Sequence, residues 1–190
     1  MSRDLMRSDE IKAFVRDAYR AVNGSTTRVA ERLYSSEELA LLPESARRGA
    51  LGLANHLRHA RIKPGATVLD LGCGSGIDTI LAAQRAGPTG RVIALDFLPE
   101  MLERTEQATR EARLENVETL EAEMEEIPLP AASVDVVISN GVINLSPRKA
   151  RALAECARVL RPGGELCVSD LTVEDELPPE ILTHPAAWAG

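Results

Sequence analysis

The chain has 190 residues, 44% of them hydrophobic, which is enough for one compact domain with a real core. Its net charge is −7 and its basic residues form no stripe interleaved with aromatic residues, so a nucleic-acid partner is not expected. No run approaches the ~18 apolar residues of a membrane span, and the N-terminus has no apolar signal core, so we expect no membrane contact. The three cysteines have no framework spacing, which indicates reduced thiols and a cytoplasmic protein.

Two helical segments are predicted before the first strand. Apolar residues recur with the helical period over residues 8–24. A second helical region, over residues 36–61, is interrupted by proline and glycine and is expected to lie over the mouth of a ligand pocket. Residues 1–62 would therefore form a helical cap on a domain that spans residues 63–190.

The cap contains a histidine pair. His56 and His59 lie three residues apart on a predicted helix, a spacing that can place two metal ligands on one side. No carboxylate or thiol clearly joins them, so we interpret the pair as part of a solvated helix face and predict no metal site.

From residue 67 onward, predicted strands alternate with predicted helices. The strands cover residues 67–71, 91–95, 117–121, 133–139 and 165–170, and the helices cover 77–86, 99–113 and 147–160. Residues 162–164, Pro-Gly-Gly, are interpreted as the turn into the last strand. This alternation predicts an α/β fold with a Rossmann-like, doubly wound parallel sheet.

The loop after the first strand is the strongest functional signal. Residues 67–78 read TVLDLGCGSGID, so an apolar strand leads through alternate glycines into a helix whose free N–H groups point at the same spot. Glycine lets the backbone turn tightly and approach a ligand closely. The candidate ligand-binding residues in this loop are Asp70, Gly72, Cys73, Gly74 and Gly76.

Spacing separates the ligand classes that use such a loop. A dinucleotide fingerprint needs glycine or alanine where this chain has Ile77 or Thr79, depending on the register, so an NAD-linked oxidoreductase is not favoured. The pattern DxGxGxG resembles the first motif of class I S-adenosylmethionine-dependent methyltransferases. That resemblance implies S-adenosylmethionine as cofactor, with Asp70 facing its ammonium group directly or through water. The alternative is a glycine-rich turn without a ligand.

A second acid follows the next strand. Asp96 ends RVIALD, where a Rossmann-like sheet holds the hydroxyl groups of a ribose, because a carboxylate can accept two hydrogen bonds from a vicinal diol. Asp96 is the predicted ribose ligand, and a helix N-cap is the alternative role. Phe97, Leu98 and Met101 would supply apolar surface near the adenine.

The third and fourth strands end in further candidates. Glu123 and Met124 follow the third strand, where Glu123 could accept a hydrogen from the adenine amine. A solvated acid in the charged run 121–126 is an equally weighted alternative. Asn140 ends the fourth strand, at the sheet edge where open α/β folds bind ligands, and is predicted to lie near the transferable methyl group. Tyr34 and Asn144 are candidates for lining the acceptor pocket.

Three segments together resemble the arsenite methyltransferase family. They are YSSEELALLPESA, GCGSGID and VVISNGVINLSP, and the resemblance covers residues 34–190. It implies a class I methyltransferase fold, S-adenosylmethionine as cofactor and a small-molecule acceptor.

The family's arsenic-binding cysteines are missing from this chain. The family carries cysteines where this chain has Leu53 and Gly141, and a third just beyond Gly190. Trivalent arsenic needs soft thiolate ligands, so arsenite is a doubtful acceptor. Cys73, Cys156 and Cys167 are interpreted as core thiols. The space beside Gly141 would suit a bulkier acceptor.

The sequence assigns no catalytic residue. Methyl transfer from a sulfonium is an in-line displacement in which positioning and exclusion of water supply most of the acceleration, and no His or Asp beside the fourth strand offers itself as a base. A catalytically silent domain that binds S-adenosylmethionine or S-adenosylhomocysteine is the alternative.

The end of the chain carries a further expectation. Class I methyltransferases usually finish the sheet with two more strands, and none can be read after Asp170. The natural protein continues, or the tail or a second subunit covers the edge of the last strand, because an open apolar edge invites pairing. A homodimer through that edge or through the N-terminal helices is therefore a possible assembly.

Overall fold

The computed structural model describes residues 8–21, 27–172, 174 and 178. Five strands form one parallel sheet in the order β3-β2-β1-β4-β5. They are β1 (Thr67–Leu71), β2 (Arg91–Asp96), β3 (Val117–Glu121), β4 (Val134–Asn140) and β5 (Leu160–Ser169). The chain order reverses beside β1, so the carboxyl ends of β1 and β4 flank a topological switch point, where sheets of this kind bind ligands. The predicted doubly wound parallel fold is confirmed.

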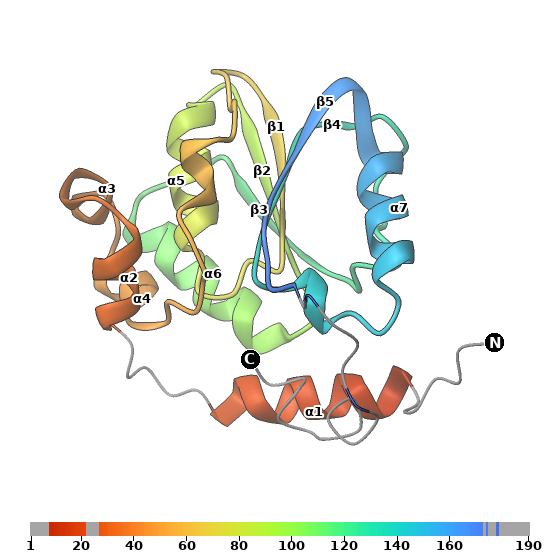
Figure 1. The fold of residues 1–190 in the computed structure, drawn as a ribbon. Helices are drawn as coiled ribbons and strands as arrows, with labels where there is room; N and C mark the ends of the chain where they lie inside the picture. Colours follow the sequence, from red (N-terminus) through yellow and green to blue (C-terminus); the bar gives the residue numbers. More distant parts are fainter. Residues whose placement is uncertain (1–7, 22–26, 173, 175–177, 179–190) are drawn as a thin grey trace.

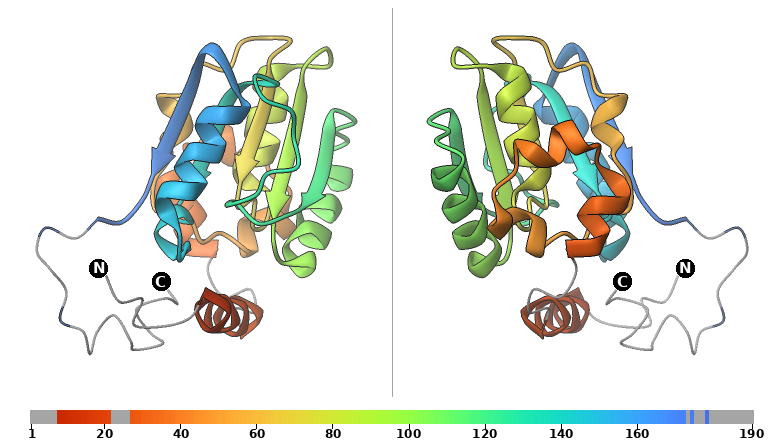
Figure 2. Two further views of the ribbon diagram at one scale, coloured as in Figure 1. Left: turned by 90° about the vertical axis from the view of Figure 1, so that its right-hand side faces the viewer. Right: turned by 90° about the vertical axis from the view of Figure 1, so that its left-hand side faces the viewer.

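Helices cover both faces of the sheet (Figures 1 and 2). Helices α5 (Ile77–Ala86) and α6 (Pro99–Glu111) lie on one face, and α7 (Lys149–Val159) lies on the other. Side chains alternate along β1 accordingly: Val68 joins the core under α5, whereas Leu69 and Leu71 join the core under α7. The three central strands, β1, β2 and β4, are buried on both faces, as parallel strands usually are.

The N-terminal segments lie on the α5 side and at the carboxyl edge of the sheet. They comprise α1 (Ser8–Ala21), α2 (Thr27–Leu33), α3 (Ser36–Ala40), α4 (Glu44–Arg48) and the 3₁₀ turn η1 (His56–Arg58). Residues from α2, α4 and η1 share the core under α5. Helix α1 runs across the lower edge of the sheet in Figure 1, and its Ile11 and Val15 pack against Leu145 of η2 (Ile143–Leu145).

Sequence patterns located the central elements well and the cap less well. Strands β1 and β3 and helix α5 have the predicted bounds. Helix α2 was not predicted, and α1 ends at Ala21, with residues 22–24 of the predicted helix outside the described part of the chain. The region over 36–61 breaks into α3, α4 and η1, as its proline and glycines indicated.

The interpretation of residues 162–164 as a turn before the last strand is wrong. Strand β5 begins at Leu160, directly after α7, and Pro-Gly-Gly lies inside it. Leu160 pairs with Val134 and Glu165 pairs with Val136, so the residues between them bulge out of the ladder. Within the part of the chain that the structure describes, no helix is long and apolar enough to cross a membrane.

Candidate functional site

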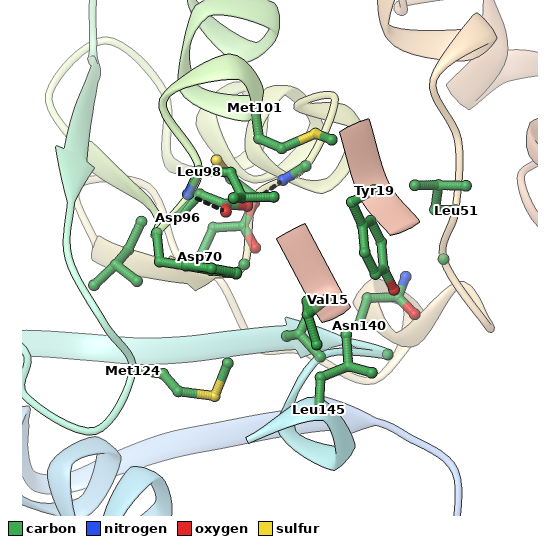
Figure 3. A pocket seen from close by; sticks show the side chains of 18 of the residues that line it. Val15, Tyr19, Leu51, Asp70, Asp96, Leu98, Met101, Met124, Asn140 and Leu145 are labelled. Carbon is green, nitrogen blue, oxygen red and sulfur yellow. Dashed lines mark hydrogen bonds between the residues drawn. The ribbon is translucent and has the colours of Figure 1, made fainter. Parts of the chain in front are cut away.

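A pocket opens at the carboxyl edge of the sheet, between the strand ends, the cap loop 49–52 and α1 (Figure 3). It brings together twelve of the predicted site residues: Tyr34, Asp70, Gly72, Cys73, Gly74, Asp96, Phe97, Leu98, Met101, Glu123, Met124 and Asn140. Gly76 does not line the pocket; it is the N-cap of α5, and its N–H donates to the Cys73 carbonyl at 2.9 Å. Gly76 thus holds the conformation of the loop through its backbone, without lining the pocket.

Asp70 is a buried carboxyl group at the pocket wall. Only 2% of the residue is exposed, and Thr79 Oγ1 donates to its Oδ2 at 2.5 Å. Burial, and then the charge of Asp78, raise the pKa of Asp70 to about 8. A buried acid of this kind fits an ammonium group, because a cation beside it would compensate the cost of ionising it. Asp70 therefore suits the amino-acid end of S-adenosylmethionine.

The glycine loop is too tight for side chains at its start. Gly72 has a φ of +77°, and a Cβ on it would lie 2.6 Å from Cγ1 of Val142. At Gly74, by contrast, a Cβ would meet nothing within 4 Å. The backbone at Gly74 therefore borders open space, so a ligand can approach it closely.

Asp96 joins the glycine loop to the start of α6. Its Oδ2 accepts from the Gly74 N–H at 3.2 Å and its Oδ1 accepts from the Leu98 N–H at 3.0 Å, the dashed bonds of Figure 3. The N-cap of α6 is Leu98, so Asp96 is not itself the N-cap. Asp96 instead accepts a hydrogen bond from the N–H of the N-cap residue. Burial raises the pKa of Asp96, and Leu98 and Met101 provide buried apolar surface beside it.

The acidic segment after β3 is not uniformly solvated. Glu123 lines the pocket and pairs with Lys12 of α1 at 2.5 Å. Glu125 is only 3% exposed and accepts from the Ser146 hydroxyl, so the interpretation of residues 121–126 as a charged run facing water is wrong for this residue. Met124 lies between them and lines the pocket, as Figure 3 shows.

Asn140 ties β4 to the cap. Its Oδ1 accepts from the Leu53 N–H at 2.9 Å, and its Nδ2 donates to the Ala54 carbonyl at 2.8 Å. The same Nδ2 donates to Asp78 Oδ2 at 2.9 Å. Tyr34 contributes from the cap, because its hydroxyl donates to Asp78 Oδ1 at 2.7 Å. Two of the three side chains that the sequence proposed for this end of the pocket, Tyr34 and Asn140, thus meet on Asp78.

Asp78 was missed by sequence reasoning, as was the burial of His56. The available signal for Asp78 was an acid in the first turn of the helix that follows the glycine loop. His56 is 4% exposed and its Nδ1 lies 3.9 Å from Asp78 Oδ2, so its assignment to a solvated face is wrong; His59 is exposed. Asn144 turns to Asp170 and does not line the pocket.

The space expected beside Gly141 is filled. A Cβ on Gly141 would lie 3.0 Å from Cγ of Leu53. Leu53 and Gly141, the two positions at which the family resemblance implies cysteines, are therefore neighbours here, and neither carries a thiol. Among the described residues, no group of three or more His, Cys, Asp or Glu side chains could hold a metal ion.

Comparisons with known proteins agree with this geometry. An arsenite methyltransferase of Halobacterium salinarum is 41% identical over 161 residues, which cover 84% of this chain and 41% of that protein. A demethylmenaquinone methyltransferase of Listeria welshimeri is 40% identical over 111 residues, covering 58% of this chain and 47% of that protein. The crystal structure of an arsenic(III) S-adenosylmethionine methyltransferase from Chlamydomonas reinhardtii has a TM-score of 0.68 at 34% identity, covering 87% of this chain and 55% of that one.

The chain spans 41% and 47% of the lengths of the two curated relatives. Residues 62–189, most of the chain, match the family described as the methyltransferase domain. Together with the strand order and the pocket at the switch point, this match shows that the chain belongs to the methyltransferase domain family, with the class I fold and S-adenosylmethionine as the family's cofactor.

Proposed function

We propose that this chain is an S-adenosylmethionine-dependent methyltransferase that acts on a small molecule. The observation that carries the proposal is the placement of two buried acids, Asp70 and Asp96, around one pocket beside the open backbone at Gly74. A sulfonium cofactor with an ammonium group and a ribose diol presents the positive charge and the hydroxyl donors that such acids need.

The lining residues that the sequence predicted have the following roles in this proposal. Asp70 binds the ammonium group, and the backbone from Gly72 to Gly74, including Cys73, supports the methionine portion. Asp96 accepts from the ribose hydroxyls, and Phe97, Leu98 and Met101 contact the adenine. Glu123 and Met124 border the adenine edge, and Asn140 lies near the methyl group that the bound cofactor supplies.

The protein contributes positioning and exclusion of water. Val15 and Tyr19 of α1 and Leu51 of the cap line the pocket from outside, and Figure 3 shows them facing the strand ends. An acceptor enclosed there meets the methyl group without competing water, which supplies much of the acceleration of an in-line displacement.

The acceptor in this proposal is not arsenite. Two of the three positions at which the family resemblance implies thiolates are Leu53 and Gly141, and the Leu53 side chain fills the space beside Gly141. Cys73 and Cys156 are buried, and burial raises the pKa of both thiols, so neither offers the thiolate that trivalent arsenic requires.

The test is incubation with methyl-labelled cofactor and a panel of arsenite, thiols, phenols and amines. We expect label to reach at least one organic acceptor, with D70N as the inactive control. A second candidate, a catalytically silent cofactor-binding domain, is favoured by the apolar Leu53–Gly141 contact. Tight cofactor binding without transfer to any member of the panel would replace the enzyme by this second candidate.

Three further expectations belong to the same proposal. Residues 1–62 act as a cap on the domain that spans 63–190. The free thiols of all three cysteines support a cytoplasmic location. A homodimer is supported by exposed Leu166 and Val168 on β5, whose outer edge has no partner strand among the described residues. Light scattering that finds only a monomer would exclude the dimer.

A further inference from the structure

The end of the pocket near Asn140 holds a carboxylate with no assigned role. Asp78, in the first turn of α5, lines the pocket together with Tyr34 and Asn140. Its two oxygens accept from these neighbours, Oδ1 from the Tyr34 hydroxyl at 2.7 Å and Oδ2 from Asn140 Nδ2 at 2.9 Å. Each carboxylate oxygen has a second lone pair, so Asp78 is held in a fixed orientation and still has acceptor capacity.

Asp78 lies at the acceptor end. Figure 3 shows Asn140, its hydrogen-bond partner, across the pocket from Asp96, beside Tyr19 and Leu51. Asp96 and its apolar neighbours would hold the adenosine half of the cofactor and Asp70 its amino-acid half, so the acceptor would meet the methyl group between them, on the side of Asn140 and Asp78.

His56 stands directly behind this carboxylate. Its Nδ1 is 3.9 Å from Asp78 Oδ2, and neither ring nitrogen makes a hydrogen bond of normal geometry. A structural histidine in a core normally has its ring nitrogens bonded, because a buried polar group without a partner costs about 1–3 kcal/mol. The imidazole lies 3.9 Å from Asp78 Oδ2, and the backbone of Ala54 is its other polar neighbour.

Other groups around His56 set its basicity. Asp78 and a hydrogen bond with the Ala54 backbone favour the charged imidazolium, whereas the Arg85 guanidinium opposes it. Cys167 of β5 donates from Sγ to the His56 carbonyl at 3.3 Å and does not engage the ring. Burial is the largest influence and lowers the pKa of His56. The ring is consequently neutral near pH 7 and ready to accept a proton.

We propose that Asp78 receives the proton that the methyl acceptor loses, and that His56 is a positioning residue that takes this proton over from Asp78. In the balanced step, a bond forms between the acceptor atom and the methyl carbon, the bond from that carbon to the sulfonium sulfur breaks with its electron pair kept on sulfur, and the acceptor proton passes to Asp78 Oδ2. Nδ1 of His56 then holds the proton opposite the regenerated carboxylate until water removes it when the product leaves.

This inference rests on the proposed function and narrows its acceptor class. This proton relay, from the acceptor to Asp78 and then to His56, is useful only to an acceptor that must lose a proton, such as a phenol or another hydroxyl group. An acceptor that is already ionised gains nothing from it. The structure thereby points to weakly acidic hydroxyl compounds, above all phenols, as acceptors.

The first test needs no turnover. The ring C–H signals of the histidines are followed by NMR as a function of pH in the wild type and in D78N, with H59Q used for assignment. We expect His56 to titrate below the ordinary value for histidine, and D78N to lower the pKa of His56 further because an attractive charge is lost. Identical titration of His56 in the wild type and in D78N would overturn the coupling.

The second test uses phenols of graded acidity as acceptors. H56Q is compared with H59Q, which changes an exposed histidine three residues away, and thermal unfolding establishes that both variants are folded. For phenol itself we expect H56Q to lower kcat about tenfold or more and to remove the acid limb of the pH profile, with S-adenosylhomocysteine affinity unchanged. For p-nitrophenol, which is ionised near neutral pH, the loss should largely disappear.

The outcomes separate the two proposals. If H56Q methylates phenols as fast as the wild type does, the relay is overturned and the methyltransferase proposal stands. The same conclusion follows if H56Q lowers kcat equally for phenol and p-nitrophenol. Transfer from the wild type only to thiols or amines likewise overturns the relay and leaves the methyltransferase. Cofactor binding without transfer to any acceptor overturns both.

Discussion

Leu53 lies against Gly141, so close that a Cβ on Gly141 would be 3.0 Å from Leu53 Cγ. The paired variant L53C/G141C would place two thiols at this contact, where two soft ligands can share one arsenic atom. We expect the wild type to retain no arsenite and the paired variant to retain one equivalent, as measured by protein-bound arsenic after gel filtration.

The same variant carries a cost in stability. Gly141 has a φ of +76°, a conformation that costs a residue with a side chain about 1–2 kcal/mol. G141A is the matched control, since it adds the backbone strain without the thiol. Arsenic retention by the wild type at stoichiometric levels would show that another set of thiols captures it and that the apolar contact is irrelevant.

Asp70 is expected to lower the stability of the ligand-free protein at neutral pH. Its folded pKa, about 8, lies above the usual value of 3.8, so the folded state binds the proton more tightly than the unfolded state. Its favourable contribution is complete below pH 4 and is lost as the pH rises to 8. D70N should therefore raise the free energy of unfolding near pH 8, by on the order of 2 kcal/mol.

Chemical denaturation of the wild type and D70N between pH 4 and 9 checks this prediction. The difference between the two should grow with pH and level off above pH 8. E118Q, at an exposed ion pair with Arg91, serves as the control and should show no such trend. Equal pH dependence of the wild type and D70N would mean that Asp70 ionises normally in the folded chain.

Asp70 and Asp96 should act on different halves of the cofactor. 5′-Methylthioadenosine contains the adenosine half without the amino-acid part. We expect D96N to weaken both this compound and S-adenosylhomocysteine about tenfold or more, or ~1.4 kcal/mol. D70N should weaken only S-adenosylhomocysteine. Calorimetric titration of both ligands measures this, and a D70N variant that loses both equally would contradict the assigned orientation.

Helix α1 should retain the bound cofactor mainly through its apolar side chains. Val15 is 4% exposed and packs in the cluster with Leu145, whereas the Lys12–Glu123 ion pair is partly solvated. Partly exposed ion pairs contribute little, typically below about 1 kcal/mol. We therefore expect V15A to speed dissociation of S-adenosylhomocysteine more than K12A does, in stopped-flow displacement. The reverse order would make the ion pair the dominant contact.

The sequence predicted the elements whose signals are local. The strand, the glycine loop and helix α5 follow one another within twenty residues, and each carries its own pattern, so the sequence alone locates Asp70 and the loop glycines. Strand β5 was placed too late because Pro-Gly-Gly has the composition of a turn, whereas pairing with β4 holds it in the sheet as a bulge.

Contacts between distant segments could not be predicted in this way. Asp78 meets Tyr34 across 44 positions and Asn140 across 62. His56 has no local pattern that indicates burial, and its position depends on packing of η1 against β5 and α5. The chemistry of the acceptor end thus emerges only when the cap is folded onto the sheet.

Titration of S-adenosylhomocysteine into the wild-type chain at pH 7, in two buffers of different ionisation enthalpy, most directly tests the pocket as a cofactor site. Asp70, with a pKa of about 8, is largely protonated at pH 7 and must ionise to meet the ligand's ammonium group. We expect one ligand per chain with nearly one proton released, and no proton release in D70N. The absence of binding, or binding without proton release, would contradict the assignment of Asp70 and of this pocket.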